Sequence, residues 1–414
     1  MDLRACGREK VAQLVERGVA VLDPFTVDVG QEVDPARIST EGVVIYPGCR
    51  IYGAKTVISP GVKLGAEGPV TLEDCRLGSE VELRGGYFRQ SVLLARASVG
   101  SGAQVREGCL LEEEATVAHC VGLKQTILFP FATLGSLINF CDCLLAGGTS
   151  RKDHSEVGSS YVHFNFTPDG DKATPSLFGD VPRGVMLNQP PIFLGGQGGT
   201  VGPVRVEFGT VVAAGCILRR DVLVEGRLVV VSSPPGLERA WRPRAYRSLT
   251  RVVRNNVIYL ANLAALEQWY EKVRRPFLTR LAMGAWLLEG ALEVLTGAKQ
   301  ERVRQLMLLA EKVPTDRKET REFRERVAEV GALFLDSALS ASVCAESAER
   351  EEEFLREADP WLRASDRSYI EAVQSLPSEL SVKGTAWLNS IVDAFCRRVE
   401  ALLPGLGTAE SRAR

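Results

Sequence analysis

Aliphatic residues recur at every sixth position through much of the first half of the chain. Steps of six from Leu93 give Leu93, Val99, Val105, Leu111 and Val117. Four positions after each stands a small or β-branched residue: Ala97, Ala103, Cys109, Ala115 and Val121. A period of six matches neither an α-helix nor a strand that reverses at hairpins. It is typical of a chain that coils around a triangular prism, so the pattern predicts an all-β parallel β-helix of hexapeptide repeats.

Glycines support this interpretation because they fall where the prism needs corners. They stand at Gly48, Gly61, Gly102, Gly108, Gly209 and Gly215, and a positive φ is cheap for glycine. The alternative is a β-sandwich with accidental spacing. Five consecutive hexads that match at both positions disfavour it.

The repeat breaks between about residues 147 and 203. This stretch is polar, and we expect it to be a loop extruded from the β-helix, since a coil can extrude a loop without disturbing its neighbours. Long loops in compact domains are often functional. The aromatic residues within it, such as Tyr161 and Phe164, argue against disorder.

The pattern becomes helical after residue 240. Apolar residues then recur at steps of three and four, beginning with Leu249, Val252 and Val253, and this spacing predicts five or six helices. Later helical stretches are expected at 278–296, 300–313, 317–349 and 384–403, and the prolines at 276, 314, 360 and 377 should separate them. The expected organisation is an N-terminal helix over 1–20, the β-helix over 21–235, an all-α domain over 240–405 and a disordered tail over 406–414.

Composition narrows the functional classes. The chain has 414 residues with a net charge of −2, which disfavours a protein built around a nucleic-acid surface. No apolar run approaches the length of a membrane span, and the N-terminus has no signal-peptide pattern. The ten cysteines are scattered, so we expect reduced thiols and a cytoplasmic protein.

Histidines are the first candidates for proton transfer near neutral pH. The chain has three: His119, His154 and His163. His154 lies in the polar stretch beside Lys152 and Asp153, so a functional and a structural role are equally open. His119 sits inside a regular hexad and favours a structural role, and His163 could be a packing residue.

A zinc site is not predicted. The histidines are 35 and 9 positions apart, which does not suit ligands from neighbouring coils. Cys141 and Cys143 form a close pair, but no second pair lies nearby to complete four ligands. The glycine-rich run over 195–199 has no adjacent lysine and precedes no helix, so it is a poor phosphate loop.

Several motifs together resemble a known family. They are Asp153-His154, Asn165-Phe166, Asp169-Gly170, Lys172 and Gly179-Asp180, followed by Gly209–Gly215 and Arg220-Asp221-Val222. The stretch from about Val19 to Trp241 resembles the C-terminal half of the bacterial bifunctional N-acetylglucosamine-1-phosphate uridylyltransferases/glucosamine-1-phosphate acetyltransferases. The nucleotidyltransferase half of that family has no counterpart here, so we do not expect pyrophosphorylase activity.

The resemblance implies a left-handed β-helix, acetyl-CoA as co-substrate, an amino sugar or sugar phosphate as acceptor, and a homotrimer with sites between subunits. By position, it implies His154 as the general base and Tyr161, Asn165 and Phe166 as the lining of the substrate site. It further implies that Lys172 meets phosphate and that the backbone of Ala214 meets the pantetheine arm.

Two positions depart from the family pattern. The sugar-phosphate lysine falls at Cys141 or Asp142, and an upstream arginine falls within 129–131, which reads Phe-Pro-Phe. Charged hydrogen bonds of this kind contribute about 1.5–3 kcal/mol each. The sequence therefore leaves three functions open: an N-acetyltransferase acting on an amino sugar or sugar nucleotide, a non-catalytic trimeric scaffold, and a nucleotide-sugar binding or nucleotidyltransferase-related protein.

Overall fold

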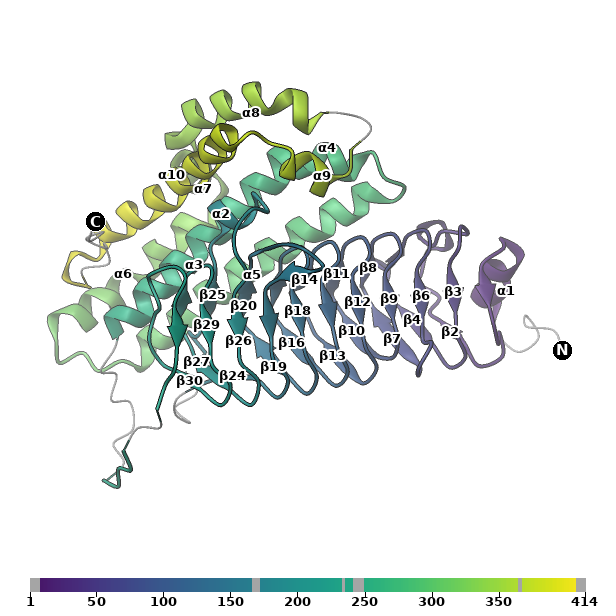
Figure 1. Ribbon diagram of the computed structural model, residues 1–414, viewed down its shortest axis with the longest axis horizontal. Coiled ribbons are helices and arrows are strands. Elements are labelled where there is room, and N and C mark those ends of the chain that lie inside the picture. The colour runs from purple at the N-terminus through teal and green to yellow at the C-terminus, as the bar shows by residue number, and fades with distance from the viewer. Residues whose placement is uncertain (1–7, 166–171, 233–234, 241–248, 364–366, 407–414) are drawn as a thin grey trace.

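The first half of the chain is a left-handed parallel β-helix. The computed structural model describes residues 8–165, 172–232, 235–240, 249–363 and 367–406. After helix α1 (Glu9–Glu16) the chain winds around a triangular prism with three parallel sheets, here named A, B and C (Figure 1). Each coil visits the sheets in that order, and we name the corners between them the A–B, B–C and C–A edges. The predicted fold class is confirmed.

The strands are short, as one face per hexad requires. Sheet A contains β1 (Ala20–Val21), β3 (Val44–Ile45), β6 (Lys63–Leu64), β9 (Glu82–Leu83), β12 (Ser98–Val99), β15 (Thr116–Val117), β18 (Thr133–Leu134), β23 (Glu156–Val157), β26 (Phe193–Leu194), β29 (Val211–Val212) and β31 (Leu228–Val229). Sheet B contains β2 (Asp28–Val29), β4 (Arg50–Tyr52), β7 (Val70–Glu73), β10 (Gly86–Arg89), β13 (Ala103–Val105), β16 (Gly122–Lys124), β19 (Asn139–Cys141), β24 (Val162–Phe164), β27 (Gly199–Val201) and β30 (Ile217–Leu218). Sheet C contains β5 (Val57–Ile58), β8 (Arg76–Leu77), β11 (Ser91–Leu93), β14 (Cys109–Leu111), β17 (Ile127–Leu128), β20 (Cys143–Leu145), β25 (Ser176–Phe178) and β28 (Arg205–Val206).

The six-step aliphatic residues fill the inside of the prism. All five residues of the series from Leu93 to Val117 are at most 2% exposed. The corner glycines adopt positive φ, for example +73° at Gly102 and +78° at Gly108, a region where other residues would be strained. The hexad therefore specifies the coil through one buried aliphatic residue per face.

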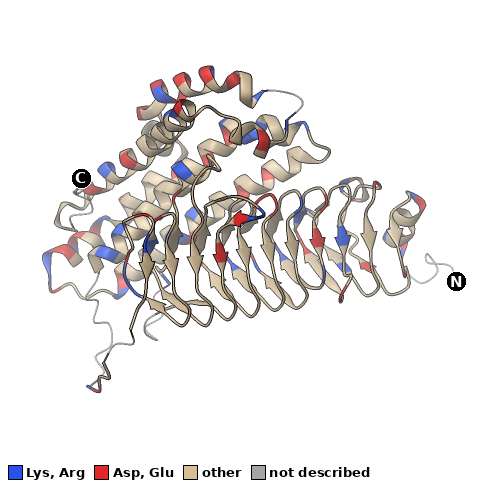
Figure 2. Cartoon of the chain, in the orientation of Figure 1, with Lys and Arg blue, Asp and Glu red and all other residues tan. Residues whose placement is uncertain are grey.

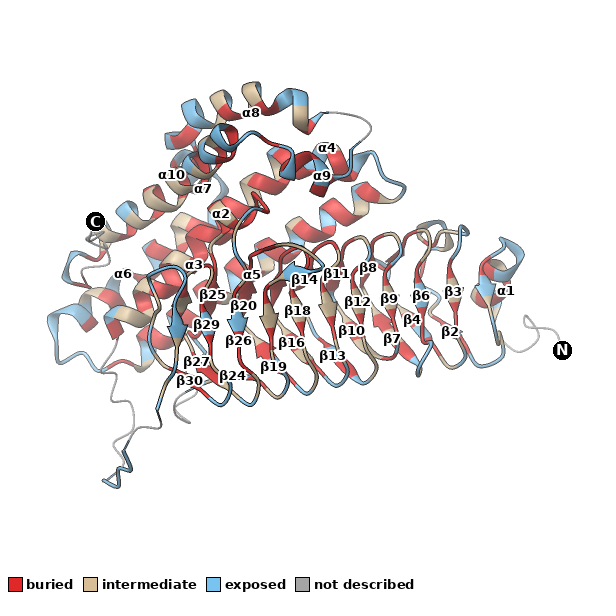
Figure 3. Cartoon of the chain, viewed as in Figure 1, coloured by how far each residue is buried: buried red, intermediate tan, exposed pale blue. Residues whose placement is uncertain are grey.

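Sheet C differs from the other two sheets because its outward side is also apolar. Its outward ladder, from the paired residues of successive strands, is Val57, Arg76, Val92, Leu110, Ile127, Leu144, Leu177 and Arg205. The aliphatic members of this ladder are at most 4% exposed. The outward side of sheet A is polar over most of its length, as at Lys63, Glu82, Ser98 and Thr116. Figure 3 shows how far each of these strands is buried. Sheet C is thus a face that must be covered.

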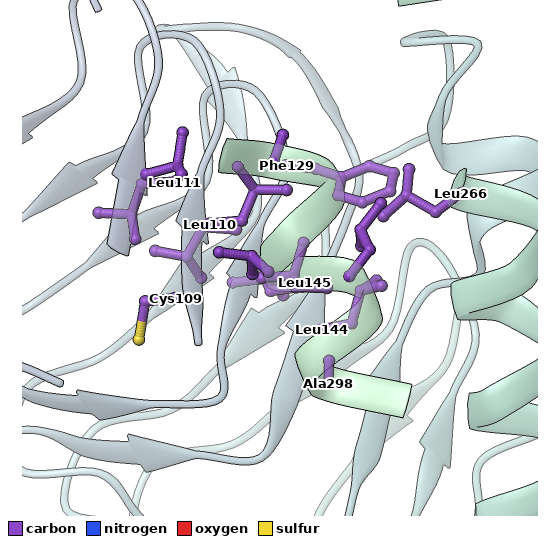
Figure 4. Close-up of a cluster of buried hydrophobic side chains, with 14 of the residues drawn as sticks. Cys109, Leu110, Leu111, Phe129, Leu144, Leu145, Leu266 and Ala298 are labelled. Atoms are coloured by element: carbon purple, nitrogen blue, oxygen red, sulfur yellow. The ribbon is translucent and has the colours of Figure 1, made fainter. Parts of the chain in front are cut away.

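The C-terminal helices provide the cover. They are α3 (Leu249–Trp269), α4 (Arg275–Thr279), α5 (Gly284–Lys312), α6 (Lys318–Leu335), α7 (Ser337–Cys344), α8 (Ala348–Leu362), α9 (Tyr369–Gln374) and α10 (Ser378–Leu402). Helices α3 and α5 lie against sheet C, and Figure 4 shows Leu110, Leu144 and Phe129 in one apolar cluster with Leu266 of α3 and Ala298 of α5. Burying a side chain of this size contributes about 1.5–3 kcal/mol.

Helix number and boundaries differ from the prediction of five or six helices. The two stretches expected at 278–296 and 300–313 are joined in the single helix α5, and Pro360 lies inside α8. The stretch expected at 317–349 divides where Asp336 ends α6 and caps the first turn of α7. Residues 241–248 and 407–414 lie outside the described residues, so the expected disordered tail is not tested beyond Leu406.

A buried charge cluster ties the helices to the prism. Arg274, 1% exposed, directs Nη2 at both carboxylate oxygens of Glu113 at 2.5 and 2.7 Å. Its Nη1 lies 3.8 Å from Glu112, which accepts a hydrogen bond from the Tyr270 hydroxyl. Burial raises the pKa of Glu112 to about 7, an effect that the Arg274 charge only partly offsets. Two carboxylates therefore share one guanidinium at the junction.

Glu112→Gln should change how stability depends on pH. A carboxyl group whose pKa is raised on folding holds its proton more tightly in the folded state, so stability falls as pH rises from about 4.5 to 7. A shift of this size corresponds to about 3 kcal/mol at most. Chemical denaturation at pH 5 and pH 8 should show a smaller loss in Glu112→Gln than in the unmodified protein. An unchanged pH slope in the variant would contradict this assignment.

Candidate functional site

The segment predicted to form one extruded loop contributes several strands to the β-helix instead. Strands β23 to β27 lie within 147–203 and continue all three sheets. Three shorter insertions leave the coil: 146–155 and 179–192 at the C–A edge, and the connection between β24 and β25 at the B–C edge. The single-loop prediction was wrong because corner insertions shift the six-step count while inward-facing residues such as Val157 and Leu194 remain buried.

His154 lies on a small antiparallel hairpin at the C–A edge. Strands β21 (Gly148–Ser150) and β22 (Asp153–His154) form it, and His154 pairs with Gly148. A Cβ on Gly148 would stand 2.5 Å from the Cα of His154, so the close approach requires glycine. The His154 ring is half-buried, and its Nδ1 has no hydrogen-bond partner among the described residues. That nitrogen is itself buried, so in this conformation it is not exposed to a bound molecule.

The hairpin is held on its prism side by Arg151. Its Nη1 lies 3.0 Å from the Glu114 carbonyl oxygen, 2.8 Å from that of Phe131 and 3.0 Å from the Thr133 hydroxyl. These oxygens belong to the C–A edge of the two preceding coils. Within the hairpin, the Thr149 hydroxyl donates to the Asp153 carboxylate at 2.8 Å.

Tyr161 does not line a site. It is fully buried inside the prism, and its hydroxyl lies 2.5 Å from the hydroxyl of Thr200. His163 is also buried, with Nε2 2.8 Å from the Ser176 hydroxyl, and burial lowers its pKa to about 3. These two residues belong to the core, so the predicted contact of Tyr161 with substrate disagrees with its position.

The remaining predicted residues lie on two other edges. Asn165 is exposed directly after β24, and Lys172 is exposed in the same insertion, both at the B–C edge. Phe166 lies outside the described residues. Ala214 is exposed at the A–B edge, after β29. One chain therefore brings His154, Asn165 and Ala214 to three different edges and does not assemble them into a single site.

His154 and Asn165 nevertheless belong to the same coil. His154 immediately precedes the sheet A strand β23, and Asn165 immediately follows β24, the next strand in sheet B. They therefore lie at nearly the same height along the prism axis. His154 is at the C–A edge and Asn165 is at the B–C edge, so faces A and B lie between them. Ala214 lies two coils further along.

The A–B edge is built mostly from small, uncharged residues in the second half of the prism, with the exposed Leu137 as the main large exception. Its corners are Gly100–Gly102, Ala118–Cys120, Gly135–Leu137, Gly158–Ser160, Gly195–Gly198 and Ala213–Gly215. Its only titratable side chains are His119, whose Nδ1 lies 2.9 Å from the Ser136 hydroxyl, and the exposed thiol of Cys120. In Figure 2 the prism edge farthest from the helices carries almost no charge over these coils.

The positions that depart from the family pattern are occupied by the helix–prism junction. Phe129 and Phe131 are at most 4% exposed beneath the helices. Asp142 accepts a hydrogen bond from Arg302 at 2.6 Å. None of these three side chains could replace the missing cations.

In the part of the chain that the structure describes, no three His, Cys, Asp or Glu side chains gather in a way that could hold a metal ion. Among the described helices, none is by itself long and apolar enough to span a membrane. Only α6 taken together with α7 and α8, bent by 73°, reaches that length and composition.

About half of the chain is similar to proteins of known function. It is 27% identical over 214 residues to the bifunctional protein GlmU of Thermotoga maritima, covering 51% of this chain and 42% of the relative. The GlmU of Pelobacter propionicus is 27% identical over 232 residues, covering 56% and 45%, and that of Nocardia farcinica is 28% identical over 233 residues, covering 56% and 41%. The chain thus spans less than half the length of these relatives, and no family model matches it.

Tyr161→Phe should test whether this residue serves the core or a site. Removing a buried hydroxyl that bonds to Thr200 should lower the free energy of unfolding by about 1 kcal/mol. Any affinity for acetyl-CoA or for amino sugars should not change. Chemical denaturation and calorimetric titration would measure the two effects. A loss of ligand affinity without a loss of stability would instead place Tyr161 in a binding site.

Proposed function

We propose that the protein is an acyl-CoA-dependent N-acyltransferase of the hexapeptide class, working as a homotrimer with its sites between subunits. The similarity of the β-helix to GlmU supports the class of fold and reaction. The proposal rests on the positions of His154 and Asn165. They belong to the same coil and lie at nearly the same height along the prism axis, His154 at the C–A edge and Asn165 at the B–C edge. The substrate is an amino sugar or a related amine, and acetyl-CoA is the acyl donor.

Symmetry explains how the two edges would meet. In a closed trimer of parallel prisms, each prism turns one edge to the axis, two faces to its neighbours and one face outward. The helices already cover sheet C, so sheet C is the outward face and the A–B edge is innermost. The C–A edge of one subunit then lies beside the B–C edge of the next. Because cyclic symmetry adds no translation along the axis, His154 lies beside Asn165 and Lys172 of the neighbouring subunit.

The residues of the two inner faces suit such contacts. The outward ladder of sheet A changes from polar to apolar in its last three coils, where Phe193, Val211 and Leu228 are 37%, 41% and 71% exposed. On sheet B, Val162 is 37% exposed in the same part of the prism. Small residues along the A–B edge permit close approach at the axis. Ala214 would then lie near the axis rather than beside His154, so its predicted contact with the pantetheine arm is the least supported.

The reaction needs one proton acceptor. The amine nitrogen attacks the carbonyl carbon of the thioester, a C–N bond forms, and the C–S bond breaks. The proton that the amine gives up passes to a ring nitrogen of His154 and then to the departing sulfur, so CoA leaves as the free thiol. Asn165 holds the acceptor by hydrogen bonds, and Lys172 meets a phosphate or another anionic group on it.

A scaffold role is the second candidate. The residues that replace the two expected cations, at 129–131 and at Asp142, are buried or paired with Arg302. A sugar phosphate would therefore find fewer cations here than the family pattern provides. This observation favours either an acceptor other than glucosamine-1-phosphate or a protein that binds without catalysis.

His154→Ala separates the two functions. The unmodified protein should release free thiol from acetyl-CoA in the presence of a suitable amino sugar, and the variant should lose activity by about 100- to 10,000-fold, the usual contribution of a general base. His119→Ala, on a different edge, is the control and should keep activity. CoA at about 100 times its dissociation constant should stabilise both proteins by about 2.7 kcal/mol. The absence of both CoA stabilisation and thiol release in the unmodified protein would reject the acyltransferase and leave the scaffold.

Phe193→Glu should disrupt the trimer. A charge placed on the apolar ladder of sheet A would be desolvated between subunits, which is unfavourable without a partner. Leu281→Glu, at another exposed apolar residue after α4, should leave the assembly intact. Light scattering coupled to gel filtration should give the mass of three chains for the unmodified protein and for Leu281→Glu, and a lower mass for Phe193→Glu. An unmodified protein that runs as a monomer would refute the proposed assembly.

A further inference from the structure

The C-terminal helices hold each of the three insertions that leave the β-helix. At the hairpin, Gln374 at the end of α9 donates from Nε2 to the Thr149 carbonyl oxygen at 2.6 Å. At the B–C insertion, Arg302 of α5 donates to the Lys172 carbonyl oxygen at 3.3 Å. At the third insertion, which contains α2 (Val181–Gly184), Asn262 of α3 accepts from the Val181 amide at 2.8 Å. The helices therefore do more than cover an apolar face.

The hairpin depends on anchors outside itself. Its two strands are only three and two residues long, and an isolated two-stranded hairpin is at best marginally stable. Arg151 fixes it to the prism, as described above. Gln374 fixes its other side and also reaches the Leu187 carbonyl oxygen at 3.3 Å. Thr149, which Gln374 holds, follows Gly148, the residue that pairs with His154.

Helix α9, which carries Gln374, is held in place by a capping box and by the contacts of Tyr369. Ser368 and Glu371 form a capping box at its start, which satisfies two backbone amides. The ring of Tyr369 lies 3.9 Å from the Arg274 guanidinium, and its hydroxyl accepts a hydrogen bond from Trp269 at 2.9 Å. Arg274 in turn is paired with Glu113, next to the Glu114 carbonyl that receives Arg151. Arg151 and Gln374, which anchor the hairpin, are therefore both connected to the buried cluster around Arg274.

We propose that Gln374 is a positioning residue that sets the place of His154 through the Thr149 carbonyl, and that the helical region thereby builds one wall of the site between subunits. The role in catalysis rests on the proposed acyltransferase function, whereas the placement of the hairpin does not. Arg302 likewise holds the insertion that carries Lys172, through the Lys172 carbonyl oxygen. The helices of one chain would thus support both parts of the site that the chain contributes, the His154 hairpin and the Lys172 insertion.

The test uses Gln374→Met, which keeps the shape of the side chain and removes the donor. Gln374 is exposed, so folding should be unaffected. Because the chain has only three histidines, ring signals in a ¹³C–¹H nuclear magnetic resonance spectrum can be assigned by single substitutions. The His154 signals should move or broaden in the variant, while those of His119 and His163 stay. Gln374→Lys, which restores a donor, should return the His154 signals toward their original positions.

Kinetics supply the second readout. Misplacement of a base by about 1 Å should lower kcat by roughly 10- to 100-fold while KM for acetyl-CoA stays the same. Unmoved His154 signals in Gln374→Met would overturn the positioning role, whatever the activity. If the unmodified protein has no acyltransferase activity but the His154 signals move as expected, the proposed function fails and the placement of the hairpin by Gln374 stands.

Discussion

The structure depends on the apolar outer face of sheet C. A β-helix buries one row of side chains inside the prism whatever surrounds it, but the second apolar row on sheet C would leave a long hydrophobic strip in water. The strip runs from Val57 to Leu177 and is covered by α3 and α5. This requirement joins the two halves of the chain into one unit and decides which faces of the prism are free for other contacts.

Covering one face has consequences for the other two. It leaves the A–B edge opposite the helices, and that edge is small and uncharged where the last coils become apolar on their outer side. It also places the helices beside both outer edges, where the insertions that carry His154 and Lys172 emerge. The buried pairing of Arg274 with Glu113 lies at this junction. It therefore helps to hold both the helices that cover sheet C and the hairpin that carries His154.

The coil could be predicted from the sequence because the inward-facing aliphatic residues recur at every sixth position. The sequence also held the signal for the covered face, in the adjacent apolar pairs Val92-Leu93, Leu110-Leu111 and Leu144-Leu145, whose first members face the helices. The insertions could not be placed from spacing, because a corner can lengthen without moving the buried row. The family resemblance implies that Tyr161 lines a substrate site, but its ring lies in the core of the prism. The separation of His154, Asn165 and Ala214 onto three edges depends on where each corner falls, which only coordinates reveal.

Mixing two inactive variants tests most directly whether His154 of one subunit works with Lys172 of the next, as proposed. His154→Ala and Lys172→Ala should each be inactive alone. After they are unfolded together, refolded and assayed for thiol release, random assembly should restore about a quarter of the interfaces, since that fraction joins an intact His154 to an intact Lys172. Recovery of about this activity would support the claim. Mixed trimers without activity, from variants whose unmodified parent is active, would contradict it.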